Sequence, residues 1–173
     1  MKIIYLARHA KSSWSSGASN DFDRPLSNRG FADAEKMGKQ LQHLEIKPEK
    51  IISSTALRAK QTCESYCEQL NIPLNEIEWN SEIYAAYTVT LLQILTAQPK
   101  AIKSIMLVGH NPAMEDLIVH LCGESAVNIH RQKNGKLLTT GNVAKIIVSV
   151  PWQQLVMHDA QLQTLLRPKT LGL

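Results

Sequence analysis

Apolar residues follow two kinds of pattern along this chain. Short runs of β-branched and aliphatic residues, bounded by polar ones, are typical of buried strands. These runs predict strands at 3–7, 50–53, 77–79 and 104–108, and an alternating segment predicts one at 143–150. The segment 152–166 fits either a strand or a helix.

Between these runs, apolar residues recur with a period close to 3.6, which predicts helices. Ser27 or Asn28 can cap the first helix, whose apolar face comprises Phe31, Ala34, Met37, Leu41 and Leu44. Further helices are predicted over 59–70, 91–95 and 114–121, with Gly123 placed to stop the last, and 125–136 is expected to be polar and irregular. Alternating strands and helices predict an α/β fold: a three-layer α/β/α sandwich with a mainly parallel central sheet, in one domain over 1–173.

Two of the apolar runs end directly at a histidine, His9 after Arg8 and His110 after Gly109. In parallel α/β sheets, ligands collect beyond the carboxyl ends of the strands, so both imidazoles are expected to face one crevice. A third run leads into a predicted helix whose first turn carries Arg58. Two histidines and two arginines at one mouth indicate a phosphate ligand.

Length and charge narrow the class of protein. A chain of 173 residues can bury roughly 70% of its unfolded surface in one core. The 19 Lys and Arg against 15 Asp and Glu are scattered, which fits an anionic substrate but does not indicate nucleic acid. The sequence has no signal segment at its start and no run near the ~18 apolar residues that span a bilayer. A soluble cytoplasmic protein is therefore expected.

Sequence patterns of several other chemistries are absent. The three cysteines, Cys63, Cys67 and Cys122, lack CxxC spacing and are expected to be buried thiols. No HExxH or HxH occurs, and a guanidinium next to His9 would repel a divalent cation, so neither a metal nor a cofactor is expected. The chain also lacks GxxxxGK[ST], GxGxxG and GxSxG.

The residues at the predicted crevice suit phosphoryl transfer. We interpret His9 as the nucleophile, since a neutral imidazole attacks phosphorus readily and a phosphohistidine intermediate divides hydrolysis into two easier steps. Its other ring nitrogen should donate to a backbone carbonyl or a carboxylate. Arg8 and Arg58 would neutralise the phosphoryl charge and His110 would donate to a phosphoryl oxygen.

Each of these residues also has a plainer interpretation. Taken alone, His9 reads equally well as a surface histidine after an edge strand, and it is the matching place of His110 that favours chemistry. Arg58 alone reads as an exposed residue at a helix start, with little influence on stability. The serine-rich segment 11–20 is expected to be an exposed loop over the site, able to act as a lid.

Four segments resemble, in order, those of a known family. They are Leu6-Ala7-Arg8-His9-Ala10, Asp23-Arg24-Pro25-Leu26-Ser27-x-x-Gly30, Ser53-Ser54-x-x-x-Arg58-Ala59-x-Gln61-Thr62 and Val108-Gly109-His110-Asn111-Pro112. The chain thereby resembles the histidine phosphatase superfamily, also called phosphoglycerate mutase-like, except that Ala10 replaces the glycine of its Arg-His-Gly signature. The short length, together with Arg24-Pro25-Leu26 and Thr139-Thr140, is most similar to the SixA branch of protein phosphohistidine phosphatases.

The resemblance implies roles for the matching residues. His9 would be the phosphorylated nucleophile, with Arg8, Arg58 and His110 completing the phosphate pocket. Arg24 would be a peripheral contact with the substrate.

The resemblance also points to a proton donor. Many relatives place a glutamate after the third or fourth strand to protonate a leaving alkoxide, and Glu82 falls about there, although Ala85-Ala86 replaces the glycine that often follows. Phosphohistidine releases an imidazole, a better leaving group than an alkoxide, and so needs less help from an acid.

The expected function is that of a metal-independent phosphatase that works through a phosphohistidine enzyme intermediate and acts on phosphohistidine in proteins. One alternative keeps the mechanism but takes a small phosphomonoester such as a sugar phosphate. Another is a non-catalytic phosphate-binding module. The expected partner is a phosphorylated protein or a small phosphorylated substrate, without nucleic acid or membrane.

Overall fold

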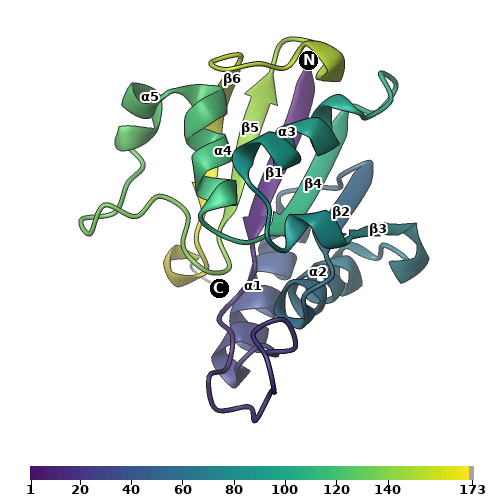
Figure 1. Cartoon of the computed structure of the whole chain (residues 1–173), viewed down its shortest axis with the longest axis vertical. Coiled ribbons are helices and arrows are strands. Elements are labelled where there is room, and N and C mark those ends of the chain that lie inside the picture. Colours follow the sequence, from purple (N-terminus) through teal and green to yellow (C-terminus); the bar gives the residue numbers. More distant parts are fainter. Residues whose placement is uncertain (172–173) are drawn as a thin grey trace.

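The computed structural model describes residues 1–171, and in it a six-stranded sheet lies between two layers of helices (Figure 1). The strands are β1 (Lys2–Arg8), β2 (Lys50–Ser54), β3 (Ile77–Asn80), β4 (Ser104–Gly109), β5 (Val143–Val148) and β6 (Ala160–Leu166). The helices are α1 (Asn28–His43), α2 (Leu57–Leu70), α3 (Thr88–Thr96), α4 (Ala113–Cys122) and α5 (Glu124–Asn128). Short 3₁₀ turns cover Leu74–Glu76, Ser81–Ile83, Trp152–Gln154 and Pro168–Thr170.

The sheet has the order β3-β2-β4-β1-β5-β6 and is mainly parallel, as predicted. Of its strand pairs, only those of β5 with β1 and with β6 are antiparallel. The register sets Arg8 opposite Gly109 and Ser53 opposite Val108, so β1, β4 and β2 end at the same edge. This edge is where the two histidines follow their strands.

Both faces of the sheet are covered, which explains the continuous apolar runs of its central strands. Tyr5 and Ala7 of β1 join the core beneath α1 and α2. Ile4 and Leu6, which alternate with them, join the core beneath α3 and α4. The three-layer α/β/α sandwich expected from the sequence is therefore confirmed.

Helix α1 begins where it was predicted, but its buried face differs. Ser27 is the N-cap, and its Oγ accepts from the backbone N–H of Gly30 at 3.1 Å. Phe31 and Leu44 are 44% exposed, so their assignment to the core was wrong. Two glycines, which hydropathy does not mark, complete the buried stripe instead: it consists of Gly30, Ala34, Met37, Gly38 and Leu41.

The other helices and the C-terminal region follow the pattern with two exceptions. Helix α2 buries its whole predicted apolar face, which consists of Ala59, Cys63, Tyr66, Cys67 and Leu70. Helix α4 ends at Gly123 as predicted. The segment 125–136 is not wholly irregular, because α5 occupies its start. Val127 is the one buried residue of this helix, and a single buried residue gives no periodic pattern in the sequence. The ambiguous 152–166 resolves into a 3₁₀ turn followed by β6. In residues 1–171, no helix is long and apolar enough to cross a membrane.

Candidate active site

The two histidines meet at the carboxyl edge of the sheet. The backbone N–H of His9 donates to the carbonyl of Gly109 at 3.0 Å, which joins the ends of β1 and β4. The ring centroids of His9 and His110 are 5.0 Å apart, and both residues are 8% exposed. Neighbouring parallel strands therefore bring the imidazoles together, as their positions in the sequence indicated.

The ring of His9 is oriented by its own backbone. Its Nδ1 lies 2.7 Å from the carbonyl oxygen of Ala10, an acceptor, so Nδ1 carries the proton and Nε2 keeps its lone pair. The Nε–H of Arg58 points at this Nε2 from 3.3 Å. Burial lowers the pKa of His9 to about 4; the hydrogen bond to Ala10 opposes this shift, and the positive charges of Arg58 and Arg8 add to it. The imidazole is thus neutral at pH 7.

Arg58 is buried, so its interpretation as an exposed helix residue is wrong. Only 6% of it is exposed, because the loop before α1 covers it. Its two terminal nitrogens donate to the carbonyl oxygen and the carboxylate of Asp21, at 2.6 and 2.9 Å. Its third donor is the Nε–H that faces His9.

Asp21 accepts most of the side-chain hydrogen bonds that connect this loop to the site, and the sequence did not indicate it. Its carboxylate accepts from Arg24 at 2.7 Å, from Arg58 at 2.9 Å and from the hydroxyl of Tyr84 at 2.9 Å. Partial burial raises the pKa of Asp21, but the hydrogen bonds from Arg24 and Tyr84 and the charge of Arg58 outweigh it and bring the pKa to about 2. Nothing in the sequence distinguishes Asp21 from Asp23, which instead accepts from Asn20 within the loop.

Tyr84 also escaped the sequence analysis, although it lies only two residues after Glu82. Its ring packs edge-on against that of His110 with a centroid distance of 5.5 Å. Its hydroxyl donates to Asp21 and so links His110 to the group of Asp21, Arg24 and Arg58, here called the Asp21 cluster.

Arg24 lies in the loop itself. It donates to the carbonyl of Ser13 at 3.0 Å and to the hydroxyl of Ser12 at 2.6 Å, and its guanidinium lies 3.4 Å from the ring centre of Trp14. The segment 11–20 is therefore tied back to Arg24. None of the described contacts links Arg24 to His9 directly.

Arg8 keeps one buried N–H donor, and His110 one buried ring nitrogen, without a partner among residues 1–171. Arg8 donates through one terminal nitrogen to the carbonyl of Leu138 at 3.0 Å, while its Nε is unpaired. The Nε2 of His110 lies 2.8 Å from the hydroxyl of Ser54, while its Nδ1 is unpaired. Burial, followed by the charge of His9, lowers the pKa of His110 to about 3. An unpaired guanidinium donor beside His9 suits an oxyanion ligand, and the ring nitrogen of His110 adds a second donor when Ser54 donates to Nε2.

Glu82 lies apart from these residues. It is exposed, and it lines a hollow of about 260 Å³ together with Asn80 and Thr90. None of the described contacts joins it to His9 or His110. Within residues 1–171, no group of three or more His, Cys, Asp or Glu side chains is arranged to hold a metal ion.

Comparisons with known proteins identify the family of this chain. The family model of the histidine phosphatase superfamily (branch 1) matches residues 4–86. A solved structure from Agrobacterium tumefaciens, assigned to phosphohistidine phosphatase SixA, is 31% identical; the match covers 96% of this chain and 98% of that one, with a TM-score of 0.80. The chain belongs to the histidine phosphatase superfamily.

Two relatives extend this family assignment. Phosphohistidine phosphatase SixA of Escherichia coli is 28% identical over 123 residues, which are 69% of this chain and 73% of that protein. An uncharacterised protein of Mycobacterium leprae is 28% identical over 158 residues, 90% of this chain and 95% of its own. Membership in the superfamily, together with SixA-like neighbours, supports a phosphatase.

Proposed function

We propose that this chain is a phosphatase that transfers the phosphoryl group of its substrate to His9 and then to water, and that its substrate is phosphohistidine in a protein. The observation that carries the proposal is the state of the His9 ring. It is neutral and buried, its Nδ1–H is engaged by the Ala10 carbonyl, and its Nε2 lone pair faces the guanidinium of Arg58.

In the first step, the lone pair of His9 Nε2 forms a bond to phosphorus as the bond from phosphorus to the leaving nitrogen breaks. The leaving imidazole takes a proton from solvent. In the second step, water attacks the phosphorus, the bond to Nε2 breaks, and inorganic phosphate leaves. The Ala10 carbonyl stabilises the positive charge that the ring carries between the two steps.

Arg8 and Arg58 would neutralise the charge of the phosphoryl oxygens, and the neutral ring of His110 would donate a hydrogen bond to one of them. The Nε–H of Arg58 already points at the place where phosphorus must approach, and the unpaired donors are Arg8 Nε and His110 Nδ1. A Ser54 hydroxyl that donates to His110 Nε2 keeps the proton of the neutral ring on Nδ1. Asp21 acts as a positioning residue, because it holds two nitrogens of Arg58 and leaves the third toward His9.

The position of Glu82 and the neighbours support the choice of substrate. An alkoxide needs a proton donor beside it, and Glu82 is exposed in a separate hollow. An imidazole leaves with less help. The named SixA proteins are described as phosphohistidine phosphatases, and the same substrate class is proposed for this chain.

The test of the nucleophile is to trap the phosphorylated enzyme. After brief incubation with a ³²P-labelled phosphoramidate, the wild-type protein should hold label that survives base and is lost in acid, as a phosphoramidate bond does. His9→Ala should hold none, while His43→Ala, which changes an exposed histidine at the end of α1, should label normally. Label retained in His9→Ala would sink the assignment.

The substrate is tested by comparing kcat/KM for a phosphohistidine protein and an alkyl phosphate on the same preparations. We expect the phosphohistidine protein to be preferred, and Glu82→Gln to change neither value by more than about twofold, against the 10²–10⁴-fold effect typical of a lost general acid. Efficient turnover of the alkyl phosphate alone would overturn the proposed substrate.

A further inference from the structure

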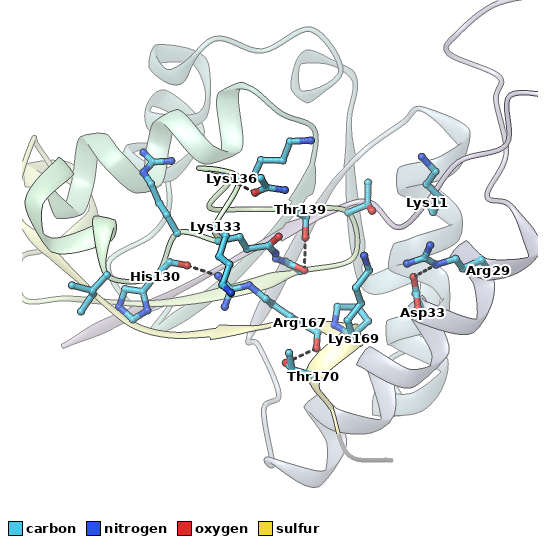
Figure 2. A pocket seen from close by; sticks show the side chains of 17 residues that line it. Lys11, Arg29, Asp33, His130, Lys133, Lys136, Thr139, Arg167, Lys169 and Thr170 are labelled. Atoms are coloured by element: carbon cyan, nitrogen blue, oxygen red, sulfur yellow. Dashed lines mark hydrogen bonds and ion pairs between the residues drawn. The ribbon is translucent and has the colours of Figure 1, made fainter.

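A second hollow, of about 750 Å³, lies between Thr139, Lys169 and the start of α1 (Figure 2). It is bounded by the loop 129–136, the turn 139–142, the 3₁₀ turn Pro168–Thr170 and the start of α1. Its size falls within the range of ligand-binding pockets.

The charge of this basic hollow is strongly one-sided. Its lining holds a single acidic residue, Asp33, which lies 3.5 Å from Arg29. The cations are Lys11, Arg29, Arg131, Lys133, Lys136, Arg167 and Lys169. The hollow thus carries more positive charge than the formal +4 of the whole chain.

Most of this charge is not balanced within the protein. Arg131 is paired with Glu115 and Glu124 at 2.9 and 3.1 Å. The four lysines of the hollow form no ion pair within residues 1–171, and in Figure 2 those labelled Lys133, Lys136 and Lys169 stand around its rim. Like charges gathered on one surface repel one another, and a bound anion relieves that repulsion.

Two residues of the wall also carry buried donors that have no partner among residues 1–171. Asn142 lines the hollow and is 1% exposed. Its Oδ1 accepts from the hydroxyl of Thr139 at 3.2 Å, while its Nδ2 has no partner among the described residues. Arg167 also lines the hollow, and its buried Nε has no partner among residues 1–171. Unpaired buried donors are costly, and both of these belong to residues that line the hollow.

Short hydrogen bonds join the wall of the hollow to Arg8 and His9. The N–H of Gly141 lies 3.1 and 3.0 Å from the carbonyl oxygens of Arg8 and His9. The guanidinium of Arg8 donates to the carbonyl of Leu138, the residue before Thr139. The turn that forms one wall of the hollow is therefore bonded directly to the segment that carries His9.

We infer that the basic hollow binds an acidic polypeptide segment of the protein whose phosphorylated residue reaches His9. This inference rests on the proposed function. Among residues 1–171, no Phe, Tyr or Trp lines the hollow to stack on a nucleotide base. The cations come from several separate segments and do not converge on one point, which suits carboxylates spaced along a chain better than one phosphate. The amides of Gln132 and Asn134 can pair with a peptide backbone.

The binding test uses a fluorescein-labelled decapeptide of glutamates and glycines, followed by anisotropy. The variant Lys133→Gln/Lys136→Gln/Lys169→Gln removes three exposed charges of the hollow and should raise the Kd about tenfold at low salt. The matched control Lys47→Gln/Lys100→Gln/Lys103→Gln removes three exposed lysines elsewhere and should bind as the wild type does. Equal Kd values for the two triple variants would overturn the inference, as would tighter binding of an oligonucleotide of equal charge.

Turnover separates this inference from the proposed function. With a phosphohistidine protein that carries acidic residues around the site, kcat/KM should fall about tenfold in the hollow variant and stay unchanged in the control. Turnover of a small phosphoramidate should be the same in all three proteins. If none of the three proteins turns over the phosphoramidate, the proposed function fails. If all three turn it over and also have the same kcat/KM for the phosphoprotein, the basic hollow is not the binding site of that phosphoprotein.

Discussion

The imidazole of His9 illustrates how a common residue becomes a nucleophile through its immediate surroundings. In water, a histidine is partly protonated near neutral pH and its two nitrogens exchange the proton. Here burial keeps the ring neutral, and the Ala10 carbonyl keeps the proton on Nδ1. The reactive nitrogen is therefore selected by one backbone hydrogen bond.

The side chain of Arg58 is expected to contribute both to turnover and to the stability of the fold. Arg58→Lys keeps the charge but loses the planar set of donors that reaches both Asp21 and His9, so kcat/KM should fall by about 10²-fold or more, as when an oxyanion donor is lost. Arg58→Ala should also lower the free energy of unfolding by about 1–3 kcal/mol, since a buried charged hydrogen bond is removed. Urea unfolding and steady-state kinetics measure the two effects.

The control for Arg58 is Lys39→Ala, which breaks one exposed ion pair with Glu35 on α1. It should change the free energy of unfolding by less than about 1 kcal/mol and leave turnover unchanged. An Arg58→Ala protein as stable as Lys39→Ala would mean that the Asp21 cluster contributes nothing to folding.

At the scale of elements, the start of α1 holds the loop that follows His9. The carbonyl of Lys11 accepts from the backbone N–H and the hydroxyl of Ser27, at 2.9 and 3.0 Å. A Cβ on Gly30 would lie 2.0 Å from this carbonyl oxygen, which belongs to the backbone and cannot rotate away. The helix can approach the loop this closely only through a glycine.

Gly30→Ala should therefore displace the loop and lower kcat/KM at least tenfold. It should cost about 1–3 kcal/mol of stability through overpacking, partly offset by about 1 kcal/mol of helix propensity. Gly38→Ala is the matched control, because it lies in the same helix but meets the side chain of Gln69 on α2. It should leave kcat/KM unchanged at a temperature where both variants are folded. Equal activity of the two variants would show that the loop tolerates the shift.

For the whole molecule, the buried histidines make stability depend on pH. The folded protein has pKa values of about 4 for His9 and about 3 for His110, and both lie below the value of about 6.5 for an unfolded histidine. Between pH 6.5 and 4 the unfolded chain binds more protons than the folded one, so the free energy of unfolding falls as pH falls. The loss is at most about 1.4 kcal/mol per pH unit for each histidine.

Urea unfolding at pH 7.0, 5.5 and 4.5 measures this slope. His9→Gln/His110→Gln removes both groups and should have a flatter profile than the wild type. His43→Gln/His158→Gln, which replaces two exposed histidines, should keep the wild-type slope. A double active-site variant with the wild-type slope would mean that other groups carry the dependence.

The sequence by itself determined most of the elements, α5 and the segment 152–166 excepted, and the order of the site residues along the chain. Continuous apolar runs at β1 and β4 required burial on both faces, and therefore a parallel sheet with a helix on each side. His9 and His110 directly follow these runs, so the topology of parallel strands was enough to bring them to one edge. The sequence also marked the start of α1 at Ser27 and the end of α4 at Gly123, because capping depends on residues that are neighbours in the chain.

Only the tertiary structure decided which side chains gather around those histidines. Asp21 and Tyr84 come from segments that have no periodic pattern. Asp21 meets Arg58 across 37 residues of sequence and meets Tyr84 across 63. The exposure of Phe31 and of Glu82, and the gathering of lysines from distant segments around the basic hollow, have the same cause. Hydropathy and spacing record how a residue relates to its near neighbours in the chain, whereas burial and charge at this site depend on neighbours that only folding supplies.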